Sequence, residues 1–301
     1  MKVVIIGLGS IGKRHVKILK HIDKSIEVYA LRSNLDKSNF PGVTNIKSFD
    51  DIIFKPDFII ISNPTYLHEQ TINMCIKIGV SIFIEKPVLS KIKNANSIIK
   101  VLKKLEIKTY VGCNMRFHPC IKYLKENLLL KSPNEVNIYH GTYLPKWREG
   151  NFREHYSSDS NKGGGVHLDL IHELDYCTWL FGFPEKVTNT YRSNSTLKID
   201  SIDFANHQLF YKSFNAGIIL NYFRNDIKRQ FEILYEDQTI HVDLLKNTIK
   251  SNEKIIYTKK TEINQLYIDQ MNFFLKNLDK PGDFENNFSY GVQILKLIVN
   301  E

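Results

Sequence analysis

Three glycines near the start of the chain have the spacing of a phosphate-binding turn. Gly7, Gly9 and Gly12 fit the pattern G-x-G-x-x-G; the apolar run Val3–Ile6 precedes them, and residues 13–20 follow with helical periodicity. In such a unit the first glycine permits a tight turn, the second lets the backbone approach a pyrophosphate, and the third lets the helix pack close to the strand. The pattern therefore predicts a dinucleotide bound at the N-terminus of the helix.

The residues just past the second predicted strand decide which dinucleotide is favoured. In this kind of fold a carboxylate about 20 residues beyond the glycines holds the ribose 2′-hydroxyl of NAD, whereas an arginine accommodates the 2′-phosphate of NADP. Arg32 follows the strand Glu27–Leu31, and Ser33 and Asn34 come next. These side chains can donate hydrogen bonds to a phosphate, and none of them is a carboxylate that would repel it. We therefore predict a preference for NADP(H) over NAD(H); the alternative is an arginine that is merely exposed at a strand end.

A lysine follows another predicted strand. The run Ser81–Ile84 leads into Glu85, Lys86 and Pro87. Polar residues just past the carboxyl ends of parallel strands converge on the ligand crevice, and proline fixes the backbone beside the lysine. We therefore predict that Lys86 donates a hydrogen bond to a reacting oxygen and polarises it. The alternative is an ordinary surface lysine in a loop.

A carboxylate and a histidine lie three residues apart in the second half of the chain. Residues 166–181 carry an apolar stripe at helical spacing. On the predicted helix Asp169 and His172 lie on the same face as Tyr176 and Trp179, which is not the face of the apolar stripe. A histidine beside a carboxylate can act as a general base with a neighbour that orients its substrate. The alternative is a hydrated polar face, or side chains that only satisfy hydrogen bonds in the core.

The loop before this helix is rich in groups that bind anions. Arg148 and Arg153 can each match a carboxylate or phosphate with two parallel hydrogen bonds. Trp147 either stacks on a flat ring or anchors the loop. The glycines at 163–165 leave backbone N–H groups available to an anion or a hydroxyl. This stretch is a candidate for substrate binding.

The elements that must position these residues divide the chain into two parts. Up to residue 118, strands alternate with helices, which predicts a parallel, doubly wound α/β sheet. From Glu135 onward, strand-like runs alternate polar and apolar residues, which is typical of a sheet with one covered and one solvated face. Amphipathic helices are predicted at 267–278 and 290–299.

Bulk composition excludes several classes of protein. The chain has 301 residues, 43% of them hydrophobic, with no apolar run near the ~20 residues of a membrane span. Its net charge of +9 comes from lysines scattered along the chain, so we expect a solvated basic surface that attracts small anions, and no nucleic-acid partner. The N-terminus has no signal-peptide pattern, and the four cysteines have no C-x-x-C spacing. We therefore expect a cytoplasmic protein with reduced thiols, without a metal and without a membrane partner.

Taken together, the motifs resemble those of the glucose-fructose oxidoreductase / inositol dehydrogenase / MocA family. The resemblance rests on segments that occur in the family's order: Gly7 to His15, Asn63-Pro64-Thr65-x-x-His68, Glu85-Lys86-Pro87, Asn114-x-Arg116-Phe117, Gly163 to Gly165 followed by Asp169, His172 and Asp175, and Trp179 to Gly182. It implies a Rossmann domain at 1–118 and, at 119–301, an α+β domain whose open, mainly antiparallel sheet covers the site and often mediates homo-oligomers.

The resemblance also implies an activity and a set of site residues. Family members are mostly NAD(P)-dependent oxidoreductases that act on sugars, cyclitols or related small molecules. Lys86, His172 and Asp169 then match the catalytic positions. The implied cofactor-binding residues are Gly7, Gly9, Ser10, Ile11, Gly12, Arg32, Ser33, Asn63, Pro64, Thr65, His68, Glu85, Lys86 and Asn114. The implied substrate-binding residues are Lys86, Arg116, Trp147, Arg148, Arg153, Asp169 and His172.

Two points remain open within this resemblance. Many members place the histidine four residues after the aspartate, whereas His172 follows Asp169 by three, so His167 is a second candidate for the base. The loop around Trp147 is similar to that of a branch associated with surface-sugar biosynthesis, which implies a nucleotide-activated sugar, a sugar acid or a nonulosonate-type substrate. The alternatives to net hydride transfer are an enzyme that oxidises its substrate only transiently, to permit elimination, epimerisation or glycoside hydrolysis, and a non-catalytic regulator that binds NADP.

Overall fold

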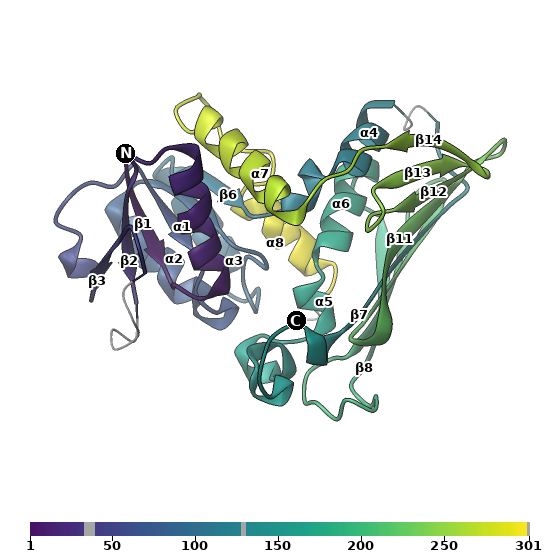
Figure 1. Cartoon of the computed structure of the whole chain (residues 1–301), viewed down its shortest axis with the longest axis horizontal. Coiled ribbons are helices and arrows are strands. Elements are labelled where there is room, and N and C mark those ends of the chain that lie inside the picture. Colours follow the sequence, from purple (N-terminus) through teal and green to yellow (C-terminus); the bar gives the residue numbers. More distant parts are fainter. Residues whose placement is uncertain (33–39, 128–130, 300–301) are drawn as a thin grey trace. The chain divides into compact units, whose positions relative to one another are not determined.

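Residues 1–32, 40–127 and 131–299 are described by the computed structural model, which divides the chain into two compact units (Figure 1). The first unit comprises Met1–Cys113 and Tyr267–Glu301, and the second comprises Asn114–Leu266. This division differs from the boundaries expected from the sequence, 1–118 and 119–301, because the C-terminal segment packs with the first unit. Its Met271, Phe274 and Leu278 belong to the same hydrophobic core as Val3 and Phe83.

The first unit is built on a parallel sheet. Within the described residues this sheet has six strands in the order β3-β2-β1-β4-β5-β6, and every neighbouring pair is parallel. This order is that of a dinucleotide-binding Rossmann fold, so the predicted fold class is confirmed. The strands are β1 (Lys2–Ile6), β2 (Glu27–Leu31), β3 (Val43–Ile46), β4 (Phe58–Ile61), β5 (Ser81–Ile84) and β6 (Thr109–Val111).

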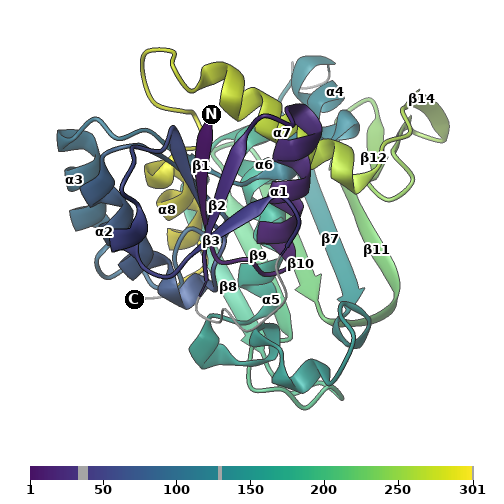
Figure 2. The same ribbon diagram turned by 60° about the vertical axis from the view of Figure 1, so that its left-hand side comes forward.

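Helices cover both faces of this sheet, as the continuous apolar strands require. Helix α1 (Ser10–Ile22) and the part of α7 (Ile263–Asn277) that belongs to this unit pack on one face. On the other face lie α2 (His68–Ile78), α3 (Ala95–Lys104) and α8 (Phe288–Lys296), as Figure 2 shows. Because the strands are parallel, the carboxyl ends of β1, β2, β4 and β5 lie at the same edge of the sheet. Helices cover both of its faces.

The second unit is built on a mixed sheet. Its strand order is β14-β13-β12-β11-β7-β10-β9-β8 across the described residues, and every pair is antiparallel except β7 with β10. The predicted α+β class with a mainly antiparallel sheet is confirmed. The strands are β7 (Glu135–Tyr143), β8 (Lys186–Arg192), β9 (Phe204–Phe210), β10 (Asn215–Asn221), β11 (Phe223–Leu234), β12 (Thr239–Asp243), β13 (Thr248–Ser251) and β14 (Lys254–Thr258).

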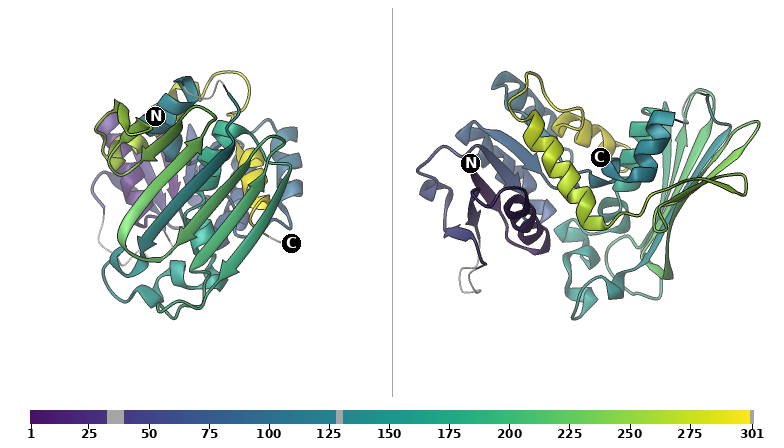
Figure 3. Two further views of the ribbon diagram at one scale, coloured as in Figure 1. Left: turned by 90° about the vertical axis from the view of Figure 1, so that its right-hand side faces the viewer. Right: turned by 45° about the horizontal axis from the view of Figure 1, so that its top comes forward.

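Three helices of this unit, α4 (Pro119–Asn127), α5 (Val166–Asp169) and α6 (His172–Phe181), lie on one face of the sheet. Its other face is left uncovered by the described part of the unit (Figure 3). Short 3-10 turns occur in the loops of both units: η1 (Phe49–Asp51), η2 (Thr65–Leu67), η3 (Asn114–Phe117), η4 (Leu144–Lys146), η5 (Phe152–Glu154), η6 (Tyr156–Ser158) and η7 (Ser160–Lys162). No helix among the described residues combines the length and hydropathy needed to cross a membrane.

The single helix predicted for residues 166–181 is wrong, because the chain forms two helices there. Leu170 leaves the helical conformation, with φ −99° and ψ 27°, and α6 begins at His172. Both residues of the break, Leu170 and Ile171, are buried. Asp169 and His172 consequently belong to different helices and do not share one helical face.

Candidate functional site

Most of the predicted cofactor-binding residues of the first unit follow the carboxyl ends of strands in the parallel sheet. After β1, β2, β4 and β5 come Gly7, Gly9, Ser10, Ile11, Gly12, Arg32, Asn63, Pro64, Thr65, His68, Glu85 and Lys86. Ser33, predicted to join them, lies outside the described residues, as does Asn34. Asn114 belongs to the second unit, where it is buried in η3.

The three glycines of the turn differ in what they permit. Gly7 has φ +90°, and a Cβ there would lie 2.6 Å from the backbone N and Cα of Asn63. A Cβ on Gly12 would lie 2.2 Å from the carbonyl oxygen of Gly7, so this glycine lets α1 approach the strand. Gly9 has ordinary dihedral angles, and no atom lies within 4 Å of a Cβ built on it. The fold therefore needs Gly7 and Gly12, whereas Gly9 leaves open space beside the backbone.

Arg32 is half-buried just past β2. Its Nη1 donates a hydrogen bond of 3.4 Å to Oδ1 of Asn45 in the adjacent strand β3. This long contact lies at the carboxyl end of β2, at the edge of the sheet.

The turn after β4 is fixed by side-chain hydrogen bonds. Asn63 donates through Nδ2 to Oγ1 of Thr71 at 2.8 Å. His68 is buried, with its ring nitrogens 3.0 Å from the carbonyl oxygen of Asn63 and 3.2 Å from that of Val88. Burial lowers the pKa of His68. His68 thus holds the loops after β4 and β5 together.

Glu85 and Lys86 occupy the end of β5. Glu85 is buried, and its Oε1 lies 2.6 Å from Nε2 of His15 in α1, so this carboxylate faces the interior of the unit. Lys86 is half-buried, and its peptide bond to Pro87 is cis.

In the second unit the carboxylate of Asp169 is held by two phenols. It is buried and accepts hydrogen bonds from Tyr156 at 3.1 Å and from Tyr222 at 2.5 Å, one on each oxygen. The negative charge of Asp169 and burial raise the pKa of Tyr156, while burial and the same charge raise that of Tyr222. Both tyrosines therefore remain protonated donors at neutral pH and fix the orientation of Asp169.

The two predicted arginines of the loop that precedes α5 are both exposed but contact different partners. Arg148 is exposed, with its guanidinium carbon 4.8 Å from the centre of the Tyr156 ring. Arg153 instead donates to the carbonyl oxygen of Leu197 at 2.9 Å. Trp147 donates to Thr142 at 2.8 Å and packs edge-on against Tyr222, so it anchors the loop.

The two candidate bases have different surroundings. His172 is the first residue of α6 and is half-buried. His167 is buried beside Tyr191, and burial lowers the pKa of His167 to about 4. A group with so low a pKa is a weak base at neutral pH, which favours His172.

Arg116, predicted to bind substrate, is engaged within the second unit. It donates hydrogen bonds of 2.8–3.2 Å to both carboxylate oxygens of Asp175, and its guanidinium lies 5.4 Å from the ring of Trp179. Arg116 and Asp175 are both buried, so this bidentate pair joins η3 to α6.

A second buried ionic group was not foreseen from the sequence. The fully buried Glu173 accepts from Arg229 at 2.7 Å and contacts His140 at 2.9 Å. Burial raises the pKa of Glu173, but the charges of Arg229 and His140 outweigh it and bring this pKa down to about 2. Its members come from α6, β7 and β11, so no local sequence pattern could have predicted this group. Tyr222, directly after β10, is also distant in sequence from its partner Asp169 and was likewise not predicted.

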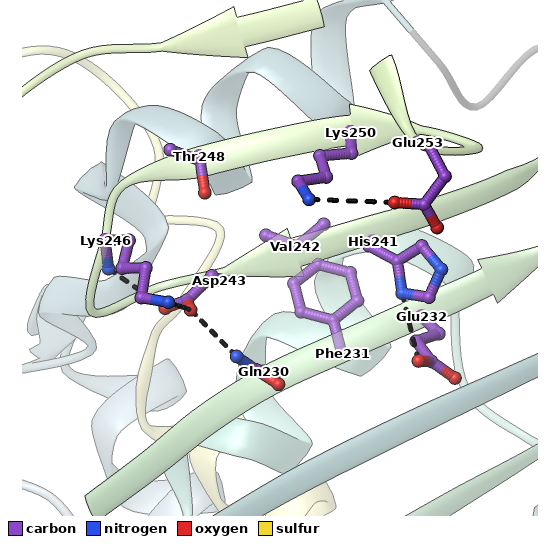
Figure 4. A pocket seen from close by; sticks show the side chains of 10 residues that line it. All are labelled: Gln230, Phe231, Glu232, His241, Val242, Asp243, Lys246, Thr248, Lys250 and Glu253. Atoms are coloured by element: carbon purple, nitrogen blue, oxygen red, sulfur yellow. Dashed lines mark hydrogen bonds and ion pairs between the residues drawn. The ribbon is translucent and has the colours of Figure 1, made fainter. Parts of the chain in front are cut away.

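A pocket lies on the uncovered face of β11, β12 and β13 (Figure 4). Its polar side chains pair with one another: Glu232 with His241 at 3.0 Å, and Gln230 with Asp243 at 2.8 Å. None of the predicted site residues lines it, so it is not the candidate site.

A Rossmann sheet with an open glycine turn, joined to a second unit with a mainly antiparallel sheet, defines the class of two-domain nicotinamide-dependent oxidoreductases. A family model described as "Oxidoreductase family, NAD-binding Rossmann fold" matches residues 1–113, and one described as "Oxidoreductase family, C-terminal alpha/beta domain" matches residues 129–261. The chain therefore belongs to the Gfo/Idh/MocA oxidoreductase family, as the sequence motifs predicted.

Three similar proteins illustrate the family. Myo-inositol 2-dehydrogenase of Thermotoga maritima is 26% identical over 94% of this chain and 89% of its own length. UDP-N-acetylglucosamine 3-dehydrogenase of Acidithiobacillus ferrooxidans is 24% identical over 83% of this chain and 76% of its own length. The structure of that enzyme superimposes with a TM-score of 0.80 at 20% identity, over 98% of this chain and 94% of that one. Levoglucosan dehydrogenase, in complex with NADH and levoglucosan, has a TM-score of 0.85 at 16% identity, over 99% and 95% of the two chains.

Proposed function

We propose that this protein is an NAD(P)-dependent dehydrogenase or reductase that transfers hydride between nicotinamide and a sugar or sugar derivative. The observation that carries the proposal is the placement of the half-buried Lys86 at the same edge of the parallel sheet as the open glycine turn. The names of the relatives support this substrate class, since they act on inositol, a UDP-sugar and levoglucosan.

The residues of the first unit fit a dinucleotide. Gly9 leaves space beside the backbone, and the first turn of α1 contains no acidic side chain to repel a pyrophosphate. Gly9, Ser10 and Ile11 would hold the pyrophosphate, and Arg32 the adenosine ribose. When bound, the nicotinamide supplies the hydride acceptor or donor.

Lys86, His172 and Asp169 have distinct roles in the proposed reaction. In the oxidative direction His172 takes the proton of the substrate hydroxyl while the carbon that bears it loses a hydride. Lys86 donates a hydrogen bond to the oxygen, where negative charge develops. Asp169, oriented by its two tyrosines, positions Lys86 or a neighbouring hydroxyl.

We further propose an anionic substrate: a nucleotide-activated sugar, a sugar acid or a nonulosonate-type intermediate. Arg148 is exposed and lies over the ring of Tyr156, which binds Asp169, whereas Arg153 is engaged by Leu197. The guanidinium of Arg148 can match a carboxylate or phosphate with two hydrogen bonds. We also propose that the uncovered face of the second unit's sheet joins copies of the chain into a homo-oligomer, which light scattering during gel filtration will test.

Activity is tested by incubating the purified protein with sugars, sugar acids and UDP-sugars, together with NADP⁺ or NADPH. We expect a change in nicotinamide absorbance that is largest with an acidic substrate. Product formation without net cofactor change would instead support transient oxidation, as in elimination or epimerisation. Tight cofactor binding with no product from any substrate would favour a regulatory protein.

Gly9→Ala and Gly12→Ala form a matched pair that tests the glycine turn. We expect Gly12→Ala to lower the melting temperature, because its Cβ would collide with the carbonyl oxygen of Gly7. Gly9→Ala should leave the melting temperature unchanged but weaken cofactor binding about 10-fold, a loss of about 1.4 kcal/mol, because its methyl group would lie where the pyrophosphate approaches. Thermal melts and nicotinamide fluorescence titrations measure the two effects. Unchanged binding in Gly9→Ala would argue against this site.

Cofactor preference is tested by paired titrations with NADPH and NADH at matched salt. We expect tighter binding of NADPH, and we expect Arg32→Ala to weaken NADPH binding about 10-fold, as loss of a charge-assisted hydrogen bond to a phosphate would. NADH binding should change little in this variant. Equal or tighter binding of NADH by the wild-type protein would contradict the role of Arg32 while leaving the rest of the proposal intact.

A further inference from the structure

A buried pair links the helix of the glycine turn to the segment that carries Lys86, directly after β5. His15 lies on α1 and Glu85 follows β5, and the two residues are 1% and 6% exposed. Nε2 of His15 lies 2.6 Å from Oε1 of Glu85. A buried carboxylate is costly unless it is paired, so this contact determines where the side chain of Glu85 can lie.

The surroundings leave the pair little freedom. The ring of His15 packs edge-on against Phe83 at 5.1 Å and against Tyr267 at 6.4 Å. Phe83 and Glu85 are two residues apart, so they face the same side of the sheet. Just past the neighbouring strand β6, a Cβ on Gly112 would lie 3.2 Å from Oε1 of Glu85, so the carboxylate is closely packed on this side as well.

The pair also acts on the backbone from which Lys86 extends. The backbone N–H of Glu85 donates to the carbonyl oxygen of Ile61 in β4 at 2.9 Å, so the sheet hydrogen bonding continues through this residue. Successive residues of an extended chain point to opposite sides. Anchoring Glu85 toward α1 therefore directs the next side chain, that of Lys86, away from α1.

We propose that His15 and Glu85 are positioning residues for Lys86. The inference rests on the catalytic role proposed for Lys86. It adds that helix α1, which follows the phosphate-binding turn, also orients the side chain of this lysine. A purely structural pair would affect stability alone, whereas a positioning pair also affects kcat and the chemical reactivity of Lys86.

The test compares three variants of the full-length protein. His15→Ala removes the contact. His15→Gln restores a side-chain N–H that can donate to Glu85. Val16→Ala is the matched control, because Val16 is the next residue of α1 and is also buried, but it belongs to the apolar core and has no polar side-chain atom that could bind Glu85. For each, kcat, KM, the dissociation constant for NADPH and the melting temperature are measured. The rate at which acetic anhydride modifies Lys86 is followed by peptide mass spectrometry.

We expect His15→Ala to lower kcat at least about 10-fold, since a small misplacement of a catalytic group has effects of this size or larger. KM and the dissociation constant for NADPH should change less than about 3-fold, because the phosphate-binding turn is untouched. The acetylation rate of Lys86 should also change relative to the other lysines. His15→Gln should recover most of kcat, and Val16→Ala should keep both kcat and the acetylation rate despite a lower melting temperature.

Equal losses of kcat in His15→Ala and Val16→Ala, or an unchanged acetylation rate of Lys86 in His15→Ala, would overturn the inference. The acetylation rate needs no substrate, so it separates this inference from the proposed function. If the wild-type protein shows no turnover but His15→Ala still alters the reactivity of Lys86, the proposed function has failed and the positioning of Lys86 stands.

Discussion

Replacement of Lys86 by methionine is expected to reduce kcat at least ~100-fold, the scale of a lost hydrogen-bond donor to developing negative charge. Methionine keeps an unbranched apolar side chain of similar length and removes the N–H groups. The dissociation constant for the cofactor should change little, because the glycine turn and Arg32 are intact in this variant. Steady-state kinetics and nicotinamide fluorescence measure the two quantities.

Lys91→Met is the matched control for this prediction. Lys91 is exposed in the same unit, five positions further along the chain, and its replacement should leave kcat unchanged. If Lys86→Met retained near-normal turnover, Lys86 would be an ordinary partly buried lysine and the reacting oxygen would need another donor. A rise in KM with unchanged kcat would give Lys86 a role in binding only.

Replacement of His172 by asparagine is expected to reduce kcat by at least ~100-fold as well, which is within the range of a lost general base. Asparagine can donate a hydrogen bond but cannot take a proton at neutral pH. Cofactor affinity should be retained, because His172 belongs to the second unit and the dinucleotide-binding turn to the first. Rates measured across a range of pH should lose the limb that reports deprotonation of the base.

His167→Asn discriminates between the two candidate bases. Because burial lowers the pKa of His167 to about 4, we expect this variant to retain turnover within a few-fold of wild type once thermal melts confirm that it is folded. A large loss of kcat in His167→Asn, with normal turnover in His172→Asn, would exchange the two assignments.

The parts of the fold that were predictable are those encoded locally. The strands β1, β2 and β5 lie where the sequence placed them, residues 13–20 belong to helix α1, and the glycine spacing marks a real turn. These features depend on neighbouring residues: strands buried on both faces must be continuously apolar, and helices must repeat every three to four residues.

The parts that could not be predicted depend on contacts between distant segments. The break at Leu170 is not marked in the apolar periodicity of the segment, which permits one continuous helix. Arg116 meets Asp175 across 59 positions of the chain, and Tyr222 meets Asp169 across 53. A sequence pattern identifies an arginine or a tyrosine but does not show which acid lies beside it.

Residues 267–299 return to the first unit, and this sets the order in which a newly synthesised chain can fold. Asn114–Leu266 is one continuous stretch, so its whole sheet is available as soon as those residues leave the ribosome. Domains usually fold as they emerge, the N-terminal one first; here the first unit to begin synthesis is the last to be completed, because Met271 and Phe274 reach its core only at the end. A chain that terminated near residue 266 would carry the entire glycine motif on a sheet with apolar surface exposed. Such a chain should be degraded by proteases before it could act as an enzyme.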